Sequence, residues 1–480
     1  MNNFEVIIGI ENHVELKTKT KMFSDAPVSF GKSPNTNVNE IDLGYPGALP
    51  SVNKKGVELA ILACNALNMK INGVLRFDRK SYFYPDLPKG FQITQQYHPI
   101  GKEGSLEIDV NGNKKVIEIE RLHIEEDTAK QIHKNGKTYI DYNRCGVGLI
   151  EIVSKPVIRT SEEAIEYVSK LRETLLFLNV SDVKMNEGSF RCDINISLRP
   201  FGFEGFGNKV EIKNLNSINN IKKAIDFEIK RQKELILNNI LIDQETRRFD
   251  ETIQETVLMR KKSDAVDYKY FREPNIYPIT LDTVWIESII NNSPELADSK
   301  RRRYIEEYNF SKEEANFILN DYYLTSFFER TLVLGINPKK VLNYLITDVK
   351  SLTNKYNYSI EKSKLEPSDL FEINKYMEEG IISSKHAKNI IPIAFESNKS
   401  IIEIIEDNNW KLISDKEEIT SLVDNIIKNN IKLIEENYLT RPERVEKTLM
   451  GELMKQTGGN INPKISMEVI NLSLKKFKKN

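Results

Sequence analysis

The sequence predicts an α+β fold in which a large antiparallel sheet is followed by helices. Residues up to about 290 contain short strand-like segments and most of the Gly and Pro residues. After "NNSPELADSK" (291–300) the apolar pattern becomes helical. A chain of 480 residues has room for about two to four domains. We therefore predict a sheet domain over 1–292, a helical domain over 293–408 and a small helical tail domain over 409–480.

The first strand-like segment, "FEVIIGIENHVEL" (4–16), separates polar from apolar side chains. Because side chains alternate along a strand, Glu11, His13 and Glu15 share one face. The opposite face carries the apolar residues Val6, Ile8, Ile10 and Val14. We therefore expect an anchored strand that presents two carboxylates and an imidazole on its polar side.

Three later segments repeat this alternation. "RCDINISLR", "KVEIKN" and "GLIEIV" each place charged or amide side chains on one face, namely Arg191, Asp193, Asn195, Ser197, Arg199, Lys209, Glu211, Lys213 and Glu151. An antiparallel sheet with one solvated face would give the same alternation. However, Asp, Asn and His have poor strand propensity, so we favour a concave sheet whose polar face binds an anionic, metal-linked ligand.

The polar face also offers candidate metal ligands. Glu11, His13, Glu151 and the "HIEED" run (123–127) supply carboxylate oxygens with one or two imidazoles. Such a set suits Mg²⁺ or Mn²⁺ better than structural zinc, which prefers Cys and His. A single His on a strand is also common as a plain hydrogen-bonded residue, so this interpretation needs a spatial model.

The segment "FDRKSYFYPDLPKGFQITQ" (77–95) interleaves Arg79, Lys80 and Lys89 with aromatic residues. This pattern suits contacts with phosphates and bases, although a Pro-stiffened surface loop would look the same. "DYNRCGVGLIEI" then places Arg144 and two glycines close to Glu151. GxxxxGK[ST], GxGxxG, HExxH and GxSxG are all absent, so any ATP must be oriented by carboxylate-held metal ions.

Capping residues mark helix starts in the second half of the chain. Ser293 before Pro294, Ser311 three residues before Glu314, and Ser368 before an apolar run each predict an N-terminus.

The bulk composition is that of an intracellular protein. The 69 basic and 70 acidic residues nearly cancel, only three Cys are present, and no run is apolar enough to span a bilayer. We expect a cytoplasmic protein without membrane contact.

Several ordered motifs resemble one known family. They are "GIENHVEL", "LGYPGALPSVN", "FDRKSYFYPDLPKGFQITQ", "HIEEDTAK", "DYNRCGVGLIEIVSKP", "EGSFRCDINISLR", "KVEIKNLNS", "QETRRFD", "DYKYFREP" and "LMGELMKQTGGNINP". Together they are similar to the B subunit of the glutamyl/aspartyl-tRNA amidotransferases, and the similarity covers nearly the whole chain.

The resemblance implies a fold and an activity. The N-terminal cradle domain would resemble the glutamine-synthetase and guanidino-kinase fold, and the helical and tail domains would hold tRNA. The chain would use ATP to phosphorylate the side-chain carboxylate of Glu-tRNA(Gln) or Asp-tRNA(Asn), and ammonia would displace the phosphate. The ammonia would come through a channel from a separate amidase, the A subunit, and a small C subunit would complete the complex.

The resemblance also implies roles for single residues. The metal ligands fall on Glu11, His13, Glu126 and Glu151, with Glu125 as the alternative to Glu126 because strand alternation groups Glu125 with His123. Lys80 and the acidic pair of "HIEED" would line the ammonia exit, with Lys80, Glu126 and Asp193 as the catalytic candidates. Arg79, Arg144, Arg191 and Lys213 are candidates for phosphate contacts, whereas Asp193 and Asn195 would hold a metal-bound water. Glu211 is a further candidate on the same face.

One segment departs from the family pattern. Many members carry two Cys pairs that bind zinc, and the matching positions here are Ser24, Ala26, Asn39 and Asp42. Neither Ser nor Ala replaces a thiolate, so we predict no zinc. Two alternative functions also stay open from sequence alone. A free-standing ATP-dependent ligase of small molecules would not need the helical third, and a non-enzymatic RNA-binding scaffold would leave the Glu and His residues unexplained.

Overall fold

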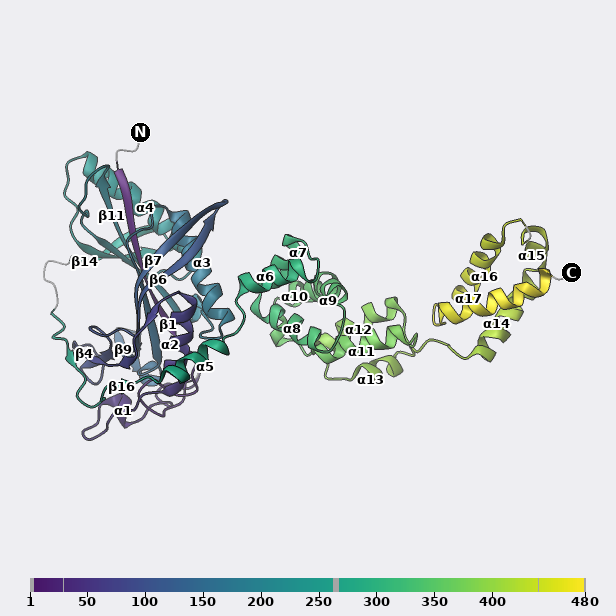
Figure 1. Ribbon diagram of the computed structural model, residues 1–480, viewed down its shortest axis with the longest axis horizontal. Helices are drawn as coiled ribbons and strands as arrows, with labels where there is room; N and C mark the ends of the chain where they lie inside the picture. Colours follow the sequence, from purple (N-terminus) through teal and green to yellow (C-terminus); the bar gives the residue numbers. More distant parts are fainter. Residues whose placement is uncertain (1–3, 29, 262–266, 439, 479–480) are drawn as a thin grey trace. The chain divides into compact units, whose positions relative to one another are not determined.

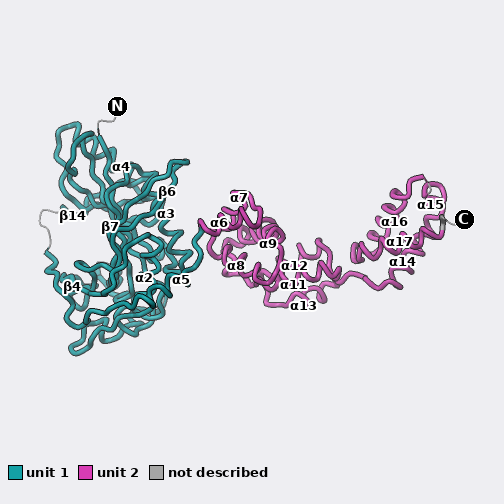
Figure 2. Tube along the Cα trace, viewed as in Figure 1, with its two compact units in different colours: residues 1–297 teal, residues 298–480 magenta. Residues whose placement is uncertain are grey.

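The computed structural model describes residues 4–28, 30–261, 267–438 and 440–478. The chain divides into two compact units, Met1–Ala297 and Asp298–Asn480 (Figure 2). This division falls close to the first predicted boundary, at residue 292. The finer division of the second half at residue 408 stays a prediction.

The described residues of the first unit form a nine-stranded sheet with the order β14-β13-β12-β11-β1-β10-β7-β6-β2 (Figure 1). Strand β1 is the first in the chain and lies in the middle of this sheet. The strands are β1 (Phe4–Glu15), β2 (Lys70–Ile71), β6 (Gly101–Val110), β7 (Asn113–Glu126), β10 (Gly148–Ser154), β11 (Phe190–Pro200), β12 (Val210–Lys213), β13 (Glu245–Asp250) and β14 (Glu255–Lys261).

The sheet is mixed, which corrects the prediction of an antiparallel sheet. All its strand pairs are antiparallel except β12 with β13, which run parallel. Helix α4 (Ile218–Leu237) connects these two strands. A parallel pair requires such a crossover, because a tight turn can only reverse the chain. The two short strands gave no sequence signal of their relative direction.

One face of the sheet is buried beneath helices α2 (Lys54–Ala66), α3 (Ser161–Phe177) and α4 (Figure 1). The apolar side of β1 belongs to this core, since Ile8, Ile10 and Val14 have no exposed surface. Burial of side chains of this size contributes about 1.5–3 kcal/mol each. The apolar face therefore fixes the register of β1, and its polar residues are left on the uncovered face.

Smaller sheets bring distant motifs of the first unit together. Strands β4 (Asp78–Ser81), β5 (Phe91–Thr94) and β15 (Phe271–Arg272) form one sheet, in which Arg79 lies opposite both Ile93 and Phe271. Strand β3 (Val74–Leu75) pairs with β16 (Ile279–Thr280), and β8 (Lys130–Lys134) pairs with β9 (Lys137–Asp141). Two short segments complete the unit, α1 (Glu40–Leu43) and α5 (Thr283–Asn291).

The second unit is helical, as predicted. Its helices are α6 (Ala297–Glu306), α7 (Lys312–Leu319), α8 (Tyr322–Val333), α9 (Pro338–Tyr344), α10 (Lys350–Tyr356), α11 (Pro367–Glu378), α12 (Ser384–Glu396), α13 (Ile401–Asp407), α14 (Lys416–Asn429), α15 (Ile431–Asn437), α16 (Pro442–Gln456) and α17 (Pro463–Leu474). Apolar residues of the last four helices form a core cluster of their own, which includes Val423, Leu449 and Ile470.

The predicted helix starts had mixed outcomes. Ser311 caps α7 as predicted, and its hydroxyl accepts a hydrogen bond from the Glu314 N–H. The prediction at Ser293 is wrong, because the next helix, α6, begins only at Ala297. The Ser293 N–H donates instead to the Ile290 carbonyl of α5. The prediction at Ser368 is also wrong. Pro367 takes the first helical position of α11, so the N-cap is Glu366.

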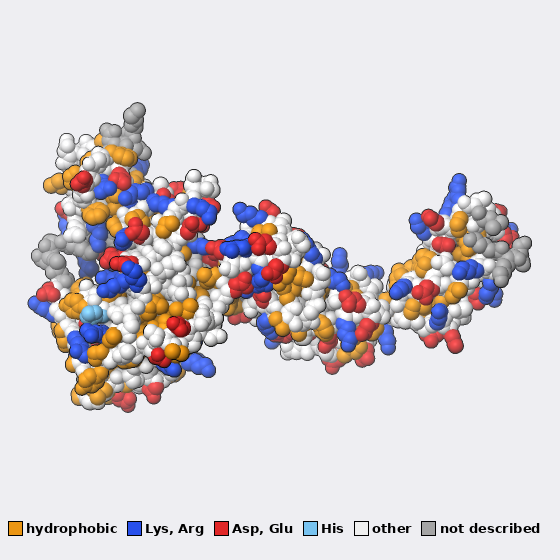
Figure 3. All heavy atoms as spheres, in the orientation of Figure 1, with side chains coloured by type: hydrophobic (Ala, Val, Ile, Leu, Met, Phe, Trp, Pro, Cys, Tyr) orange, Lys and Arg blue, Asp and Glu red, His pale blue; other side chains and the backbone are white. Residues whose placement is uncertain are grey.

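The visible surface shows no segregation of charge. Basic and acidic side chains are interspersed over both units on the face drawn in Figure 3, as the near-zero net charge suggests. Within the described ranges, none of the helices has both the length and the hydrophobicity needed to cross a membrane.

Candidate functional site

The polar face of the large sheet lines a cavity of about 600 Å³. Its walls are mostly polar, and they come from segments that are far apart in the sequence. The lining residues are Glu11, His13, Lys80, Thr94, Gln96, Arg121, His123, Glu125, Glu151, Asp193, Lys209, Glu211, Lys213, Arg260, Lys261, Tyr268 and Tyr270. Charges of both signs therefore converge on one hollow, which is the arrangement expected for a phosphate-containing ligand held with cations.

The strand register explains why these residues meet. His13 lies directly opposite Glu151 on one neighbouring strand and Arg191 on the other. Glu11 lies opposite Asp193, and Glu151 lies opposite His123. Directly opposed side chains on one face are within contact distance, so pairing alone brings them together. The predicted alternation of β1, β10, β11 and β12 is confirmed.

The first group of possible metal ligands contains His13, Glu125 and Glu151. The Nε2 atom of His13 lies 3.3 Å from Glu151 and 3.7 Å from Glu125. His123 Nε2 lies 3.3 Å from Glu151 and 3.4 Å from Glu125. Both imidazoles thus face both carboxylates, so the four side chains form one compact cluster.

This cluster shifts the pKa values of its members. Burial alone would lower the pKa of His123, but the Glu151 and Glu125 carboxylates outweigh it and raise the pKa to about 9. The pKa of His13 is raised for the same reason. Burial disfavours the charged form of Glu151, yet the two imidazoles hold its pKa well below the ordinary range. The two carboxylates therefore stabilise protonated imidazoles by more than burial destabilises them.

The second group contains Glu11, Asp193 and Glu211. The Lys213 ammonium lies 2.5 Å from Asp193 and 3.1 Å from Glu211. The Asn195 amide donates a 2.8 Å hydrogen bond to Glu11. Burial and the neighbouring Glu151 and Asp193 charges raise the pKa of Glu11. The expected sharing of one ion by Glu11 and His13 is not what the geometry suggests, because the two residues fall in separate groups.

Glu126 does not reach either group. Its carboxylate accepts hydrogen bonds from Lys89 Nζ at 2.5 and 2.6 Å and from the Ile93 N–H at 2.9 Å. Consecutive residues of β7 point to opposite faces, so Glu125 enters the cavity and Glu126 points away from it. The structure thus brings Glu125, the alternative ligand, to the place expected for Glu126.

Three of the four predicted phosphate contacts lie outside the cavity lining. Arg79 forms a two-pronged ion pair with the buried Glu273, at 2.5 and 3.1 Å. Arg191 and Arg144 both contact the buried Asp127, at 2.7 and 3.4 Å. Lys213 and Lys80 do line the cavity, and Lys80 Nζ lies 4.9 Å from the ring centre of Tyr268.

Sequence reasoning missed several cations and aromatic rings of the cavity. Lys209 was visible in the alternation of "KVEIKN" but was assigned no role, whereas His123 of "HIEED" was counted only as a possible second imidazole. Arg121, Arg260 and Lys261 carried no motif signal. Strand register brings Arg121 and Arg260 to the polar face, and Lys261 reaches the cavity from the end of β14. Tyr268 and Tyr270 come from "DYKYFREP", which contributed only to the family resemblance.

The segment matching the family's zinc site is held by hydrogen bonds. Asp42 accepts a hydrogen bond from Ser24 Oγ at 2.7 Å and pairs with Lys21 Nζ at 2.9 Å. Lys21 is completely buried. The Asn39 amide donates to Asp25 at 2.7 Å, and Ala26 offers no ligand atom. The contacts of Asp42 with Lys21 and Ser24 are buried and that of Asn39 with Asp25 is exposed, and these side chains are not a zinc ligand set.

Comparison with known proteins places this cavity in a family. Residues 6–287 match the model described as the GatB/GatE catalytic domain, and residues 326–474 match the GatB domain model. The chain belongs to the GatB family. Every lining residue of the cavity falls within the catalytic-domain match.

Relatives of this GatB-family chain match it from end to end. The protein from Mesoplasma florum is 62% identical over 471 residues, 98% of either chain. The protein from Mycoplasma mycoides subsp. mycoides is 61% identical over 482 residues and covers both chains fully. The protein from Staphylococcus carnosus is 44% identical over 99% of this chain and all of its own. Each is named as the B subunit of aspartyl/glutamyl-tRNA(Asn/Gln) amidotransferase.

The donor set of the GatB cavity fits hard divalent cations. Each group offers carboxylate oxygens, with one imidazole in the first group, and the ligand atoms of a group lie within 4.8 Å of one another. Mg²⁺ and Mn²⁺ prefer such oxygen-rich sets. The Oδ1 atom of Asn195 is buried beside the second group without a hydrogen-bond partner among the described residues, so it can accept from a bound water.

Glu15, at the end of the polar face of β1, makes the stability of the folded chain depend on pH. Burial and the Asp127 charge raise its pKa to about 7 from an ordinary 4.5. The native state therefore binds more protons than the unfolded chain between these values, and stability falls as the pH rises through that window. We expect Glu15→Gln to be about 3 kcal/mol more stable than wild type at pH 8 and nearly equal at pH 4.5.

Urea denaturation at pH 4.5, 6 and 8 measures this difference. Glu5→Gln is the matched control on the same strand, because Arg199 and Arg159 lower the pKa of Glu5. That control should show no gain at high pH. A Glu15→Gln advantage that does not change with pH would contradict the prediction.

Proposed function

We propose that this chain acts as the B subunit of a tRNA-dependent amidotransferase. It would convert Glu-tRNA(Gln) or Asp-tRNA(Asn), or both, into the corresponding amide in an ATP-dependent reaction. The observation that carries the proposal is the cavity within the GatB catalytic domain. Two clusters of carboxylates, two imidazoles and several Lys and Arg side chains meet there. The full-length similarity to proteins that carry this name supports it.

The chemistry explains why such a cavity is needed. A carboxylate resists attack by ammonia until one of its oxygens becomes a good leaving group, and transfer of a phosphoryl group from ATP provides one. Bound Mg²⁺ or Mn²⁺ would neutralise negative charge on the phosphates. Ammonia would then displace phosphate and form the amide. Positioning and charge neutralisation are the main tasks left to the protein.

The residues divide into two cation-holding groups. His13, Glu125 and Glu151 would hold one cation, and His123 would orient the two carboxylates from the side. Glu11, Asp193 and Glu211 would hold another, with Asn195 positioning Glu11. Glu125 replaces Glu126 as the proposed ligand, because only Glu125 points into the cavity. The ligand set thus follows the faces of the strands.

The cations of the cavity would bind phosphate oxygens. Lys209, Lys213, Arg260 and Lys261 line the side of β12 and β14. Arg79, Arg144 and Arg191 are proposed instead to hold the surrounding loops, since each lies outside the cavity lining and is paired with a buried carboxylate. Lys80 would face the arriving ammonia, because Glu125 and Glu151 counteract its burial and keep its pKa above the usual range. It would therefore stay protonated beside the acceptor.

The activity would require partners. We propose an amidase, the A subunit, that delivers ammonia, a small C subunit, and tRNA held by the helical second unit. The large sheet with its polar face would resemble the glutamine-synthetase and guanidino-kinase fold. A translation enzyme of this kind would work in the cytoplasm. A free-standing small-molecule ligase is not favoured, because the relatives match this chain through the helical unit as well.

The test follows amidation without glutamine, in the complex of this chain with its co-purified partner subunits. Conversion of Glu-tRNA(Gln) to Gln-tRNA(Gln) is measured with ATP, Mg²⁺ and ammonium, for wild type and for His13→Ala. We expect product from wild type only in the presence of ATP, and at least about a hundredfold less from His13→Ala, given the 10- to 100-fold cost of losing even an outer partner of a metal. Equal rates would remove His13 from the mechanism, and ATP-independent product would refute the proposed function.

A further inference from the structure

Among the described residues of the Glu11, Asp193 and Glu211 group, Glu211 is the carboxylate that a hydroxyl of the neighbouring strand β13 holds. Its Oε2 atom accepts a 2.8 Å hydrogen bond from the Thr246 hydroxyl, and its Oε1 atom lies 3.1 Å from Lys213. Thr246 is 1% exposed and Glu211 is 9% exposed. A buried hydroxyl therefore fixes the direction of one carboxylate at the cavity.

The strand pairing makes this contact direct. Glu211 of β12 and Thr246 of β13 are partners in the parallel ladder, so their side chains leave the sheet on the same face. Thr246 in turn lies opposite Arg260 of β14, which lines the cavity. Thr246 thus lies between Glu211 on one neighbouring strand and Arg260 on the other.

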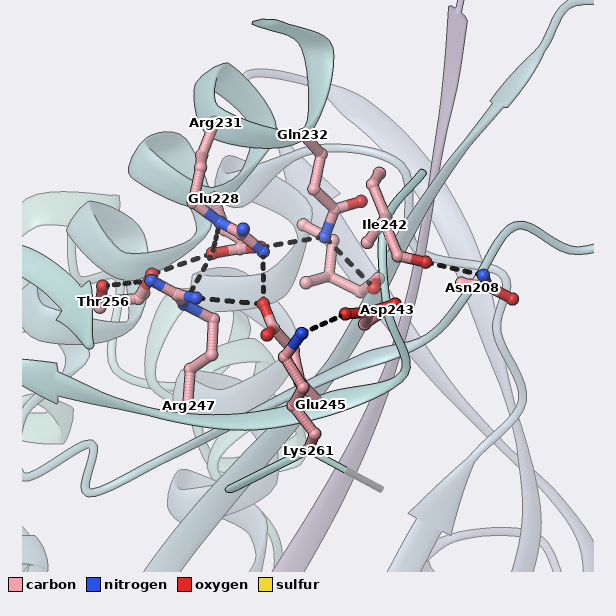
Figure 4. Close-up of polar contacts among 11 residues, drawn as sticks. Asn208, Glu228, Arg231, Gln232, Ile242, Asp243, Glu245, Arg247, Thr256 and Lys261 are labelled. Atoms are coloured by element: carbon pink, nitrogen blue, oxygen red, sulfur yellow. Dashed lines mark hydrogen bonds and ion pairs between the residues drawn. The ribbon is translucent and has the colours of Figure 1, made fainter. Parts of the chain in front are cut away.

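The residues on either side of Thr246 anchor its strand from the opposite face. Glu245 and Arg247 point toward α4, where they meet Glu228 and Arg231 (Figure 4). Arg231 contacts Glu245 at 3.0 Å, and Arg247 contacts Glu245 at 2.9 Å. These four side chains, which we call the clamp, form a closed set of alternating charges.

The two carboxylates of the clamp are buried, its two arginines are partly buried, and the clamp reaches the next strand. Glu228 has no exposed surface and also accepts a 2.8 Å hydrogen bond from the hydroxyl of Thr256 on β14. Arg247 donates to Thr256 Oγ1 at 2.9 Å and to its carbonyl at 2.7 Å. A fully hydrogen-bonded buried network restricts its members to one arrangement. The clamp therefore holds β13 and β14 against α4, on the face of β13 opposite to Thr246.

We propose that Thr246 is a positioning residue that sets the Glu211 carboxylate for cation binding. This inference rests on the proposed function of the Glu11, Asp193 and Glu211 group. Thr246 would not touch the cation. It acts as an outer hydrogen-bond donor that holds one ligand oxygen so that the other faces the group, and loss of such partners typically costs 10- to 100-fold in metal affinity.

The test compares Mn²⁺ binding in the full-length chain with its co-purified partner subunits, followed by electron paramagnetic resonance of free Mn²⁺. Thr246→Val removes the hydroxyl but keeps the branched shape, and Thr246→Ser keeps the hydroxyl. Thr256→Val is the matched control, because it removes a hydroxyl at the same 2.8 Å distance from a buried glutamate away from the cavity. Glu211→Gln identifies the Mn²⁺ ion that belongs to this group.

We expect Thr246→Val to weaken binding of the Mn²⁺ ion that Glu211→Gln loses by about tenfold or more. The Mn²⁺ affinity of Thr246→Ser should stay within about twofold of wild type. Thr256→Val should lower the melting temperature about as much as Thr246→Val does, with less than a twofold change in affinity. Equal affinity in wild type and Thr246→Val, or equal losses in both valine variants, would overturn the positioning role. A wild type with no Glu211-dependent ion would refute the proposed cation site itself.

Discussion

Replacing Glu125 with Gln is expected to lower amidation of Glu-tRNA(Gln) by at least about a hundredfold. Glu125 faces His13 and His123 across the cavity, and an amide of the same size cannot supply the second negative charge there. Losing an outer metal partner already costs 10- to 100-fold, and a direct ligand should cost more.

The neighbouring substitution Glu126→Gln is the matched comparison. It leaves the Lys89 ammonium buried without its charged partner, and breaking such a pair costs about 3–5 kcal/mol. We therefore expect Glu126→Gln to lose stability while the folded fraction keeps a larger share of its activity. Single-turnover amidation and urea denaturation of both variants check this. The assignment of ligands by strand face would fail if Glu126→Gln were the inactive, stable variant.

Replacing Lys21 with Met is expected to destabilise the first unit by about 3–5 kcal/mol. Lys21 and Asp42 are 0% and 2% exposed and form an ion pair of 2.9 Å. Removal of the ammonium leaves a buried carboxylate whose charge has lost its counterion, and that desolvation cost is large relative to total stability. The Ser24 hydroxyl at 2.7 Å offsets only part of it.

The double variant Lys21→Met with Asp42→Asn tests the cause. The amide introduced by Asp42→Asn would carry no charge but would keep an oxygen for Ser24, so we expect the double variant to recover most of the lost stability. Urea denaturation followed by circular dichroism measures wild type and both variants. A double variant that is less stable than Lys21→Met would show that the carboxylate acts through its hydrogen bonds rather than through its charge.

Strand periodicity accounts for most of what the sequence could predict about the site. The polar faces of β1, β10, β11 and β12 follow directly from alternation, and pairing then brings Glu11, His13, Glu151 and Asp193 together. In "HIEED", alternation groups Glu125 with His123 and puts Glu126 on the other face, as the structure does. The family resemblance pointed to Glu126, whereas the geometry favours the residue that the periodicity selected.

The arginines could not be placed in this way. Arg79 is paired with Glu273, nearly two hundred residues further along, and Arg191 with Asp127. A sequence shows the type of a side chain but not the distant residue with which that side chain forms an ion pair. The same limit hid the parallel pairing of β12 with β13, which depends on where α4 returns the chain. Local signals such as the Ser311 cap were more reliable, although Pro367 displaced the predicted cap of α11.

The central position of β1 has a consequence for synthesis of the chain. Phe4 pairs with Pro200, and His13 pairs with both Glu151 and Arg191. Strand β1 therefore leaves the ribosome about 10–40 s before its partners, at 5–20 residues per second. Its row of Ile and Val residues stays exposed for that time, and such non-local pairing is slow to form. We infer that the nascent chain is most prone to aggregation before residue 200 has emerged.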